Sequence, residues 1–392
     1  MRSALGRVYV AKAARVYVSG MLAVLIPLYL GVLGYSASIV GLALVAILAG
    51  NALANIVLSR FERHLGRRRF LMLFSLLMAL SGLALALGSG PALILAACFM
   101  GNISTTGTEA GPFQSIEAGI LPELAGGKGA SRAFGIYNLI GYLASSAGAL
   151  TASAPDYLGG GLGVYRGLFA AFAAVGALLL VIYASLVGIE AAREPEGEAG
   201  LSGLNPAARR DVVRLSALFS VDAFGGSFVS VYVLTYWFHV SYGAGPALLG
   251  PVFSATSLIS AASVYGAAVV AAKLGNLRTM FYSHIISNVF LLLIPFAGSL
   301  LGSLGLLFLR QSTSQMDVPT RQAFMGELFG QKERVTAFAI TNTARSVSAF
   351  AGGPVSAFMF AFGMLTGPIF AGGLSKAAYD IAIFGTYRKR YR

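Results

Sequence analysis

The sequence predicts an all-α membrane protein with twelve transmembrane helices in two pseudo-symmetric six-helix bundles. Three observations lead to this fold class. Hydrophobic residues make up 57% of the 392 residues and charged residues only 11%, whereas about a quarter of an ordinary soluble domain is charged. The second half of the chain repeats part of the first, and the basic residues gather in alternate loops. The composition excludes a soluble enzyme.

The individual helices follow from apolar stretches of about 20 residues, which short turns rich in Gly, Pro and Ser separate. We expect spans at residues 13–34, 38–59, 70–88, 92–121, 132–153, 166–189, 212–239, 247–272, 278–298, 302–325, 335–361 and 366–387. Turns such as 34–36 and 88–91 are so short that the helices they join must be antiparallel neighbours. The first stretch follows basic residues but has no small-residue cleavage site, so we interpret it as a retained helix and not a signal peptide.

A single long polar stretch separates the first six spans from the last six. It covers residues 190–211 and includes the run Glu-Pro-Glu-Gly-Glu at 194–198. We therefore predict an N-terminal bundle at 1–189, a cytoplasmic linker at 190–211 and a C-terminal bundle at 212–392.

The two halves share a repeat with a constant offset of 204 residues. Without gaps, the segment 123–148 matches the segment 327–352 at Glu123/Glu327, Leu124/Leu328, Gly126/Gly330, Lys128/Lys332, Ala133/Ala337, Phe134/Phe338, Ile136/Ile340, Asn138/Asn342, Ala147/Ala351 and Gly148/Gly352. Duplicated halves of this kind occur in secondary transporters, where the substrate site lies at the repeat interface near the bilayer midplane.

The basic residues indicate which ends of the helices lie in the cytoplasm. Of the 28 Lys and Arg residues, 23 fall in alternate connections or in the termini, and the opposite connections contain only Arg166. Cytoplasmic loops collect positive charge, so both termini and the linker are predicted to be cytoplasmic. The net charge of +13 is explained in the same way, and we expect no nucleic-acid partner.

Six plus six helices with a cytoplasmic linker, and basic loops after helices 2 and 8, resemble the major facilitator superfamily over essentially the whole chain. The superfamily's loop motif, of the type G-x-x-x-D-R-x-G-R-R, is similar to residues 59–68. Gly66, Arg67 and Arg68 match it, whereas Ser59 replaces the first glycine and Arg63 replaces the acid. The resemblance implies a cytoplasmic gate at Arg63, Gly66, Arg67 and Arg68, in which either Glu62 substitutes for the missing acid or the latch is weaker. Glu117 falls near the cytoplasmic end of its span and is assigned to the same gate, as a partner of Arg132 or Lys128.

Other strings resemble a prokaryotic branch of the superfamily, for which no substrate is implied. They include Thr-Gly-Thr-Glu-Ala-Gly-Pro-Phe at 106–113 and Arg-Gln at 310–311, followed by Ser-Gln-Met-Asp-Val-Pro-Thr-Arg-Gln at 314–322. The glycine-rich helix 5 motif of many drug/proton antiporters has no counterpart at 133–153, which argues against that group.

Seven charged residues within the predicted spans are singled out as candidate intramembrane charges. A charge at the bilayer centre costs about 2.5 to 3.5 kcal/mol even on the mildest scale, so each retained one is a candidate functional residue. They are Glu109, Glu117, Asp222, Arg310, Asp317, Arg321 and Arg345.

The acids among them are candidates for proton coupling. Glu109 has no arginine at similar depth in its own half and is the first choice; Asp222 and Asp317 follow. Asp222 could instead pair permanently with Arg321 or Arg345. Asp317 and Arg321 are four residues apart, which also fits a purely structural ion pair.

The basic and amide side chains are candidates for substrate binding. An arginine fork matches carboxylate or phosphate oxygens, and an acid with two arginines could share one patch of the C-terminal half. The candidates are Arg321, Arg345, Asn138, Asn342, Gln315, His284 and Asn288. The asparagines of the repeat equally suit helix packing, and a lone histidine is more often a packing residue than a ligand. Lys376 and Asp380, an i, i+4 pair, are interpreted as structural.

The residues therefore predict a secondary transporter of a small organic solute that works by alternating access, with proton-coupled export (antiport) as the leading hypothesis. Uptake of an organic anion by symport or uniport is the alternative, and a receptor or lipid-moving protein on the same fold is a third. One cysteine and three histidines make a transition-metal site improbable, and no nucleotide-binding motif is present. We expect no cofactor, a monomer in contact with membrane lipid, and a location in the cytoplasmic membrane.

Overall fold

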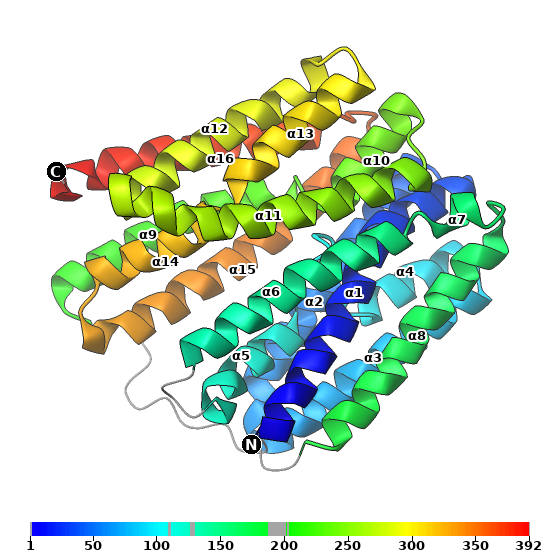
Figure 1. Ribbon diagram of the computed structural model, residues 1–392, viewed down its shortest axis with the longest axis horizontal. Coiled ribbons are helices and arrows are strands. Elements are labelled where there is room, and N and C mark those ends of the chain that lie inside the picture. Colours follow the sequence, from blue (N-terminus) through cyan, green and yellow to red (C-terminus); the bar gives the residue numbers. More distant parts are fainter. Residues whose placement is uncertain (1, 109–110, 126–129, 187–200, 202–203, 392) are drawn as a thin grey trace. The chain divides into compact units, whose positions relative to one another are not determined.

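Each of the twelve predicted spans contains at least one helix within the residues that the structure describes. The computed structural model describes residues 2–108, 111–125, 130–186, 201 and 204–391, and within these ranges it contains helices and no strand (Figure 1). The helices are α1 Arg2–Val32, α2 Ala37–Leu65, α3 Arg67–Leu87, α4 Pro91–Met100, α5 Pro112–Leu124, α6 Ala130–Thr151, α7 Ala154–Tyr157, α8 Leu162–Ala184, α9 Pro206–Ser227, α10 Val231–Tyr242, α11 Pro246–Leu274, α12 Asn276–Leu293, η2 Ile294–Phe296, α13 Leu300–Ser314, α14 Asp317–Leu328, α15 Gln331–Ala361, α16 Gly367–Tyr387 and η3 Arg388–Tyr391. The predicted all-α fold class is confirmed.

Length and composition agree with a membrane protein. Within the described ranges, seven helical stretches are long and apolar enough to cross a bilayer, among them Ala4–Val32, Arg67–Leu87 and Leu162–Ala184. Many large apolar side chains on these helices are exposed, for example Leu80 at 47% and Val181 at 67%. Such a surface is expected where lipid replaces water as the solvent.

The fourth, seventh and tenth spans are each broken into two helices, although the sequence predicts each as continuous. The fourth is interrupted between α4 and α5, where Gly107 and Gly111 have φ of 73° and 87°. The seventh breaks before Ser230, whose side chain accepts from the Val233 amide, and the tenth breaks between Ser314 and Asp317. A break frees backbone donors and acceptors that the helix would otherwise pair. Transporters place polar sites next to such breaks.

The duplication extends beyond the repeat seen in the sequence. Helix α1 begins at Arg2 and α9 at Pro206, and α5 ends at Leu124 and α14 at Leu328, so both pairs of boundaries are 204 positions apart. The sixth and twelfth spans, α8 and α16, match within one residue at the same offset. The two six-helix halves are thus built on one plan.

Contacts divide the described residues into two compact units. Unit 1 comprises those within 1–193, 230–257 and 360–363, and unit 2 those within 194–229, 258–359 and 364–392. Most of the predicted linker 190–211 lies outside the described residues, and α9 begins within it.

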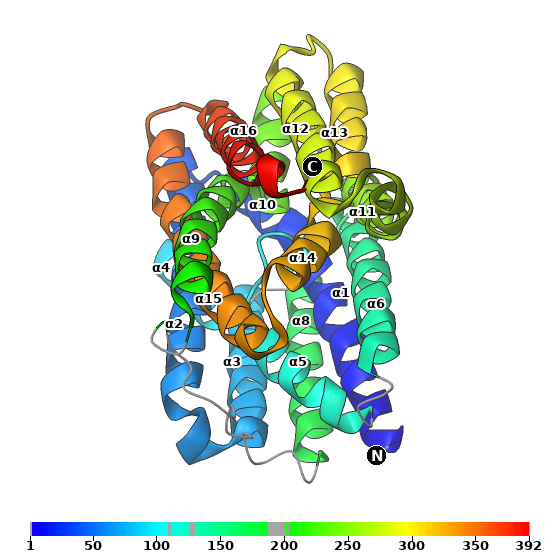
Figure 2. The same ribbon diagram turned by 90° about the vertical axis from the view of Figure 1, so that its left-hand side faces the viewer.

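Each unit has its own helix packing. In unit 1, α1 lies along α6 and α3 along α8 (Figure 1). The segment 230–257 also packs there, since Tyr232 Oη donates to the Val40 carbonyl at 2.8 Å and the Ala247 amide donates to Asp156 at 2.7 Å. In unit 2, α12 packs against both α13 and α16 (Figure 2).

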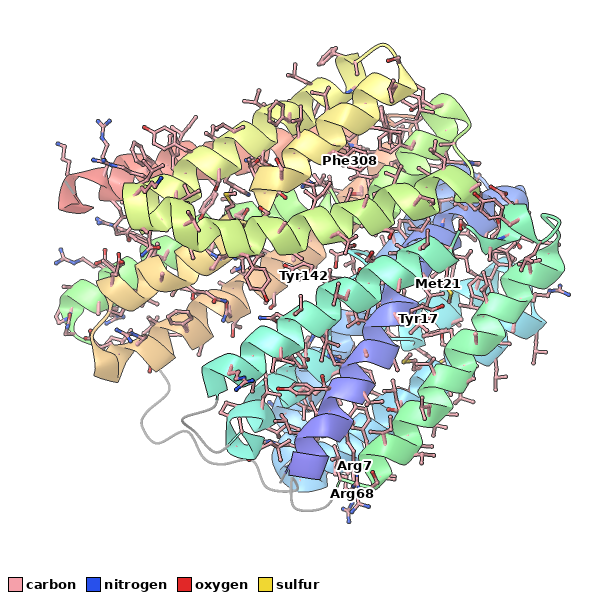
Figure 3. The ribbon with its side chains drawn as sticks, viewed as in Figure 1. Arg7, Tyr17, Met21, Arg68, Tyr142 and Phe308 are labelled. Carbon is pink, nitrogen blue, oxygen red and sulfur yellow. The ribbon has the colours of Figure 1, made fainter. Side chains whose placement is uncertain are left out.

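Glycines of the repeat allow two helix pairs to approach closely. A Cβ atom on Gly148 of α6 would lie 1.8 Å from the carbonyl oxygen of Tyr17 on α1, close to Met21 (Figure 3). A Cβ atom on its counterpart Gly352 of α15 would lie 1.7 Å from Ser227 Oγ on α9. Small residues at such crossings are the usual means of close helix packing in membranes.

Replacing Gly148 with Ala should therefore destabilise unit 1 by about 3 kcal/mol, the upper part of the range for overpacked cores, because the obstacle is backbone that cannot rotate away. Gly352→Ala should cost less, because the nearest atom, Ser227 Oγ, can rotate away, and the next atoms, Ser227 Cβ and the Phe224 carbonyl oxygen, lie at 2.9 and 3.1 Å. Thermal unfolding of the purified protein measures both. Gly135→Ala on the same helix, where a Cβ meets no atom within 4 Å, is the control, and an equal loss in this variant would contradict the packing argument.

Candidate functional site

A buried carboxylate in unit 2 accepts hydrogen bonds from three cations on three different helices. Asp222 of α9 is 3% exposed. Its Oδ2 lies 2.8 Å from Arg345 Nη1 of α15 and 3.2 Å from Arg321 Nη1 of α14, and its Oδ1 lies 2.8 Å from Lys376 Nζ of α16. The Phe219 ring, one turn before Asp222, lies under both guanidinium groups at 5.5 and 6.0 Å. Asp222 thus joins four helices of the unit.

Two further carboxylates complete this group, which we call the Asp222 cluster. Asp317 Oδ2 accepts from Arg321 at 2.9 Å. Asp380 accepts from His284 Nδ1 at 2.6 Å and from the Asn288 amide at 2.8 Å. The cluster consists of Asp222, His284, Asn288, Asp317, Arg321, Arg345, Lys376 and Asp380.

Local helix geometry explains why these side chains meet. Residues four apart lie on one face of a helix, and the pairs His284/Asn288 on α12 and Lys376/Asp380 on α16 are each four apart. Since α12 and α16 pack against each other, the two polar faces meet in the interior. Asp317 lies in the first turn of α14, where the helix dipole favours a negative charge.

The contacts of His284 fit one neutral tautomer. With the proton on Nδ1, the ring donates to the Asp380 carboxylate, and Nε2 can accept from Lys376 Nζ, 3.2 Å away. The cluster contains three carboxylates and three cationic side chains besides this ring, so in this tautomer its charges balance.

A second charged group, the Arg15 cluster, is buried in unit 1. Glu117 of α5 is fully buried, and its Oε2 accepts from Arg15 Nη2 of α1 and Tyr137 Oη of α6, each at 2.7 Å. Its Oε1 accepts from Tyr183 Oη of α8 at 2.5 Å. Lys12 lies over the Tyr137 ring at 3.9 Å. The sequence predicts Arg132 or Lys128 as the partner of Glu117; the partner in the structure is Arg15, and Lys128 lies outside the described residues.

The predicted gate residues lie at the junction of α2 and α3. Gly66 has φ 78°, which a glycine adopts readily. Arg67 Nη1 lies 3.3 Å from Glu123 Oε1 near the end of α5, and Arg68 donates to the Ala184 carbonyl at the end of α8. The side chain of Arg63 is outside the described part of the structure. Arg67 and Arg68 thus tie three helix ends together within unit 1.

The structure brings most of the predicted site residues of the second half into one cluster, and leaves others apart. Asp222, Asp317, Arg321, Arg345, His284 and Asn288 are members of the Asp222 cluster. Asn138 and Asn342 are both exposed, on α6 and α15, and Gln315 is half-buried between α13 and α14. Glu109, the first choice for proton coupling, lies outside the described residues.

Several members of the two clusters are not among the site residues predicted from the sequence. Lys376 and Asp380, predicted as a structural pair, contact Asp222 and His284 respectively. Arg15 and Lys12, counted among the basic residues of the N-terminus, lie within α1, which begins at Arg2, and are 5% and 3% exposed. The available signal was their spacing of three, which places them on one face of a helix.

A mostly apolar groove adjoins the Asp222 cluster within unit 2. Its volume is about 250 Å³, and it is lined by Ser220, Val221 and Phe224 of α9 and by Ser348 and Ala351 of α15. Ser220 and Val221 directly precede Asp222, and Ser348 lies one turn beyond Arg345. Among the described residues, no group of three His, Cys, Asp or Glu is arranged to hold a metal ion.

Comparison with known proteins agrees with the all-helical membrane fold described above. The family model of the Major Facilitator Superfamily matches residues 8–353. An uncharacterized membrane protein of Saccharomyces cerevisiae is 25% identical over 90% of this chain and 83% of its own length.

Solved structures are similar in fold. The nucleoside transporter NupG superposes with a TM-score of 0.75 at 12% identity, covering 99% of this chain and 100% of its own. A bacterial homologue of the iron transporter ferroportin gives 0.71 at 11% identity, covering 98% and 99%. A D-xylose-proton symporter gives 0.69 at 15% identity, covering 96% and 95%.

Proposed function

Because the chain belongs to the Major Facilitator Superfamily, and is therefore a membrane transporter and not an enzyme, we propose that it carries a small organic anion together with a proton by alternating access. The observation that supports this is the charge balance of the Asp222 cluster. Three buried carboxylates face three partly buried cations, and the His284 ring lies between Asp380 and Lys376.

A proton on His284 would upset this balance. Nε2 could no longer accept from Lys376, and two positive charges 3.2 Å apart repel each other by about 5 kcal/mol at an effective dielectric constant of about 20. The new N–H could donate to Asp222 Oδ1, which lies 3.7 Å away. The cluster would then carry one excess positive charge in a buried place, which is costly.

An anion that binds with the proton would restore neutrality. Arg345 is the most accessible cation of the cluster, since its side chain is 25% exposed against 11% for Arg321 and 12% for Lys376. A guanidinium binds carboxylate or phosphate oxygens through paired hydrogen bonds. The apolar groove beside Ser348 suits a hydrophobic part of the same molecule, so an amphipathic monoanion fits best.

This arrangement gives coupling a direction. The empty cluster and the cluster with both proton and anion are neutral, whereas the forms with only one of them carry a net charge. If only neutral forms rearrange easily, proton and anion must cross together, as in symport. Because proton binding and anion binding favour each other, the cluster favours uptake by symport. The leading hypothesis from the sequence is export. Export would require proton and solute to compete, and the receptor and lipid-moving alternatives would require no proton flux.

The remaining expectations from the sequence belong to the same proposal. We place the transporter in the cytoplasmic membrane as a monomer, with both termini and residues 190–211 in the cytoplasm. The N-terminal bundle at 1–189 and the C-terminal bundle at 212–392 would give access to the two sides of the membrane in turn. The basic residues of the alternate loops support this orientation.

The proposal is tested in proteoliposomes with a trapped pH-sensitive dye. Three amphipathic monoanions, benzenesulfonate, toluenesulfonate and butanesulfonate, are added outside with and without an inward proton gradient, and protein-free vesicles give the leak. At least one of these anions should drive proton entry, and the gradient should drive its accumulation. Symport would be contradicted if none of the three anions drove proton entry, or if protons entered only when no anion was added.

Replacing His284 with Gln should remove both the response to the gradient and anion exchange at equal pH, because the cluster with an anion but no proton carries a net negative charge. Glutamine is polar but cannot take up a proton, so accumulation should fall to the level without a gradient. His64→Gln, at an exposed histidine near the end of α2, is the control. Full gradient-driven accumulation in His284→Gln would show that another group carries the proton.

A further inference from the structure

Arg310 is a buried arginine that the Asp222 cluster does not use. It lies on α13 and is 9% exposed. Residues 303, 307, 310 and 314 recur at helical spacing and form the buried face of α13. The guanidinium therefore projects from the same face as the core residue Leu307, and Ser314 follows one turn later.

This arginine has no counter-ion among the described residues. Its Nη1 donates to the neutral Gln311 Oε1 at 2.8 Å, and its Nε–H has no partner. No described carboxylate lies within 4 Å of it, in contrast to Arg321 and Arg345 of the same unit. An arginine cannot escape the cost of burial by losing its proton.

The dipole of α13 offsets only part of the cost of burying the Arg310 charge. Arg310 lies one turn before the C-terminus of α13, where the helix dipole favours a cation by at most about 2 kcal/mol. A charge at the centre of a bilayer costs at least about 2.5 kcal/mol. The dipole alone leaves the guanidinium short of full compensation, and its Nε–H still has no partner among the described residues.

Further polar atoms near α13 lack partners. Ser314 Oγ on α13 and Ser263 Oγ on α11 are buried without a hydrogen bond among the described residues. Gln311 joins the two helices, because its Nε2 donates to Ser260 Oγ while its Oε1 faces Arg310. Gln311 is thus fixed with its acceptor on the arginine, and Ser263 lies one turn from Ser260 on α11. Buried polar groups without partners are uncommon in native proteins and call for a ligand or water.

We propose that Arg310 is the centre of a second anion-binding site, separate from the Asp222 cluster, that binds one carboxylate or phosphate group. The guanidinium supplies the charge and paired donors, Gln311 holds it in place, and Ser314 supplies a hydroxyl. The anion is either a dissolved ion or the headgroup of a membrane lipid, since both present the same oxygens. The site does not depend on the proposed symport, because it shares no residue with the Asp222 cluster.

Thermal unfolding in neutral detergent tests this site with inorganic phosphate at constant ionic strength. Phosphate should raise the Tm of the wild type by about 2 °C or more, and Arg310→Gln should lose this shift. Gln311→Glu should lose it too, and should raise the Tm without phosphate, because the new carboxylate becomes a built-in counter-ion. The exposed Arg278→Gln is the matched control, which also corrects for the general stabilising effect of phosphate.

The same four proteins are then compared in phosphatidylcholine vesicles with and without phosphatidylglycerol. Stabilisation by phosphatidylglycerol that depends on Arg310 would assign the site to a lipid headgroup, and stabilisation by phosphate would assign it to a dissolved anion. Equal shifts in all four proteins, or no shift of the wild type in either experiment, would overturn the proposal. A phosphate shift lost in Arg345→Gln but kept in Arg310→Gln would also overturn it, because binding would then belong to the Asp222 cluster. If Arg310→Gln does not fold, Gln311→Glu decides alone.

Discussion

Replacing Asp222 with Asn is expected to abolish anion-dependent proton entry and to lower the free energy of unfolding by about 3–5 kcal/mol. The substitution removes the negative charge that three cations share at 2.8 to 3.2 Å. Removing one partner of a buried ion pair is this costly because the remaining charge is left uncompensated. Transport should be lost because the freed cations leave no neutral empty state. Proteoliposome flux and thermal unfolding measure the two effects.

A second substitution separates charge balance from packing. The double variant Asp222→Asn with Lys376→Met removes one charge of each sign, so it should recover most of the lost stability. Coupling should remain lost, because His284 would no longer face an ammonium group. An Asp222→Asn variant with unchanged stability and full flux would show that the Asp222 cluster neither holds unit 2 together nor takes part in transport.

Replacing Glu117 with Gln should destabilise unit 1 by a similar amount, about 3–5 kcal/mol, with a smaller effect on coupling. Glutamine can still bond the hydroxyls of Tyr137 and Tyr183, but the guanidinium of Arg15, whose side chain is 6% exposed, loses the carboxylate 2.7 Å away. The expected loss therefore reports the lost charge pairing between Glu117 and Arg15 and not missing hydrogen bonds to the tyrosines. Thermal unfolding in detergent is the measurement.

The charge-neutral double variant Arg15→Met with Glu117→Gln is the control for this prediction. It removes both charges and should be more stable than Glu117→Gln alone, since replacing a buried pair by neutral groups is often nearly neutral. Equal destabilisation of the single and double variants would contradict the ion-pair explanation and would indicate a loss of packing.

The fold was predictable because its signals are periodic and local. Apolar stretches of membrane length and the turns between them gave the twelve spans, and the matches around Gly148 and Gly352 gave the duplication. The breaks in the fourth, seventh and tenth spans were not predicted. Near the fourth break, Gly107 and Gly111 could equally have been packing glycines within a helix, and only their positive φ values distinguish the two cases.

The candidate site was predictable in part. The cost of burying charge selected Asp222, Asp317, Arg321 and Arg345, which do meet in unit 2. Lys376 was set aside because a charge four residues away on its own helix offered a simple partner. Which helix a long side chain reaches depends on tertiary packing, and spacing within one helix does not reveal it.

The repeat also shows why the side-chain partners in one half could not be predicted from those in the other. At the offset of 204, Glu117 corresponds to Arg321 and Arg15 to Phe219. In unit 1 this pair of positions forms an ion pair, and in unit 2 it forms a cation–π contact at 5.5 Å. The duplicated fold preserves the contact while the chemistry has changed, so a prediction from symmetry alone assigns the wrong partners.

The central claim is that proton and anion bind together at the Asp222 cluster. Its most direct measurement is the number of protons exchanged with the medium when the anion selected in the flux experiment binds to the purified protein in weak buffer. We predict that the wild type takes up protons, approaching one per anion, at a pH where His284 starts neutral, and that His284→Gln takes up none. Release of protons on binding would contradict symport and favour exchange, and no proton movement in the wild type would contradict coupling at this cluster.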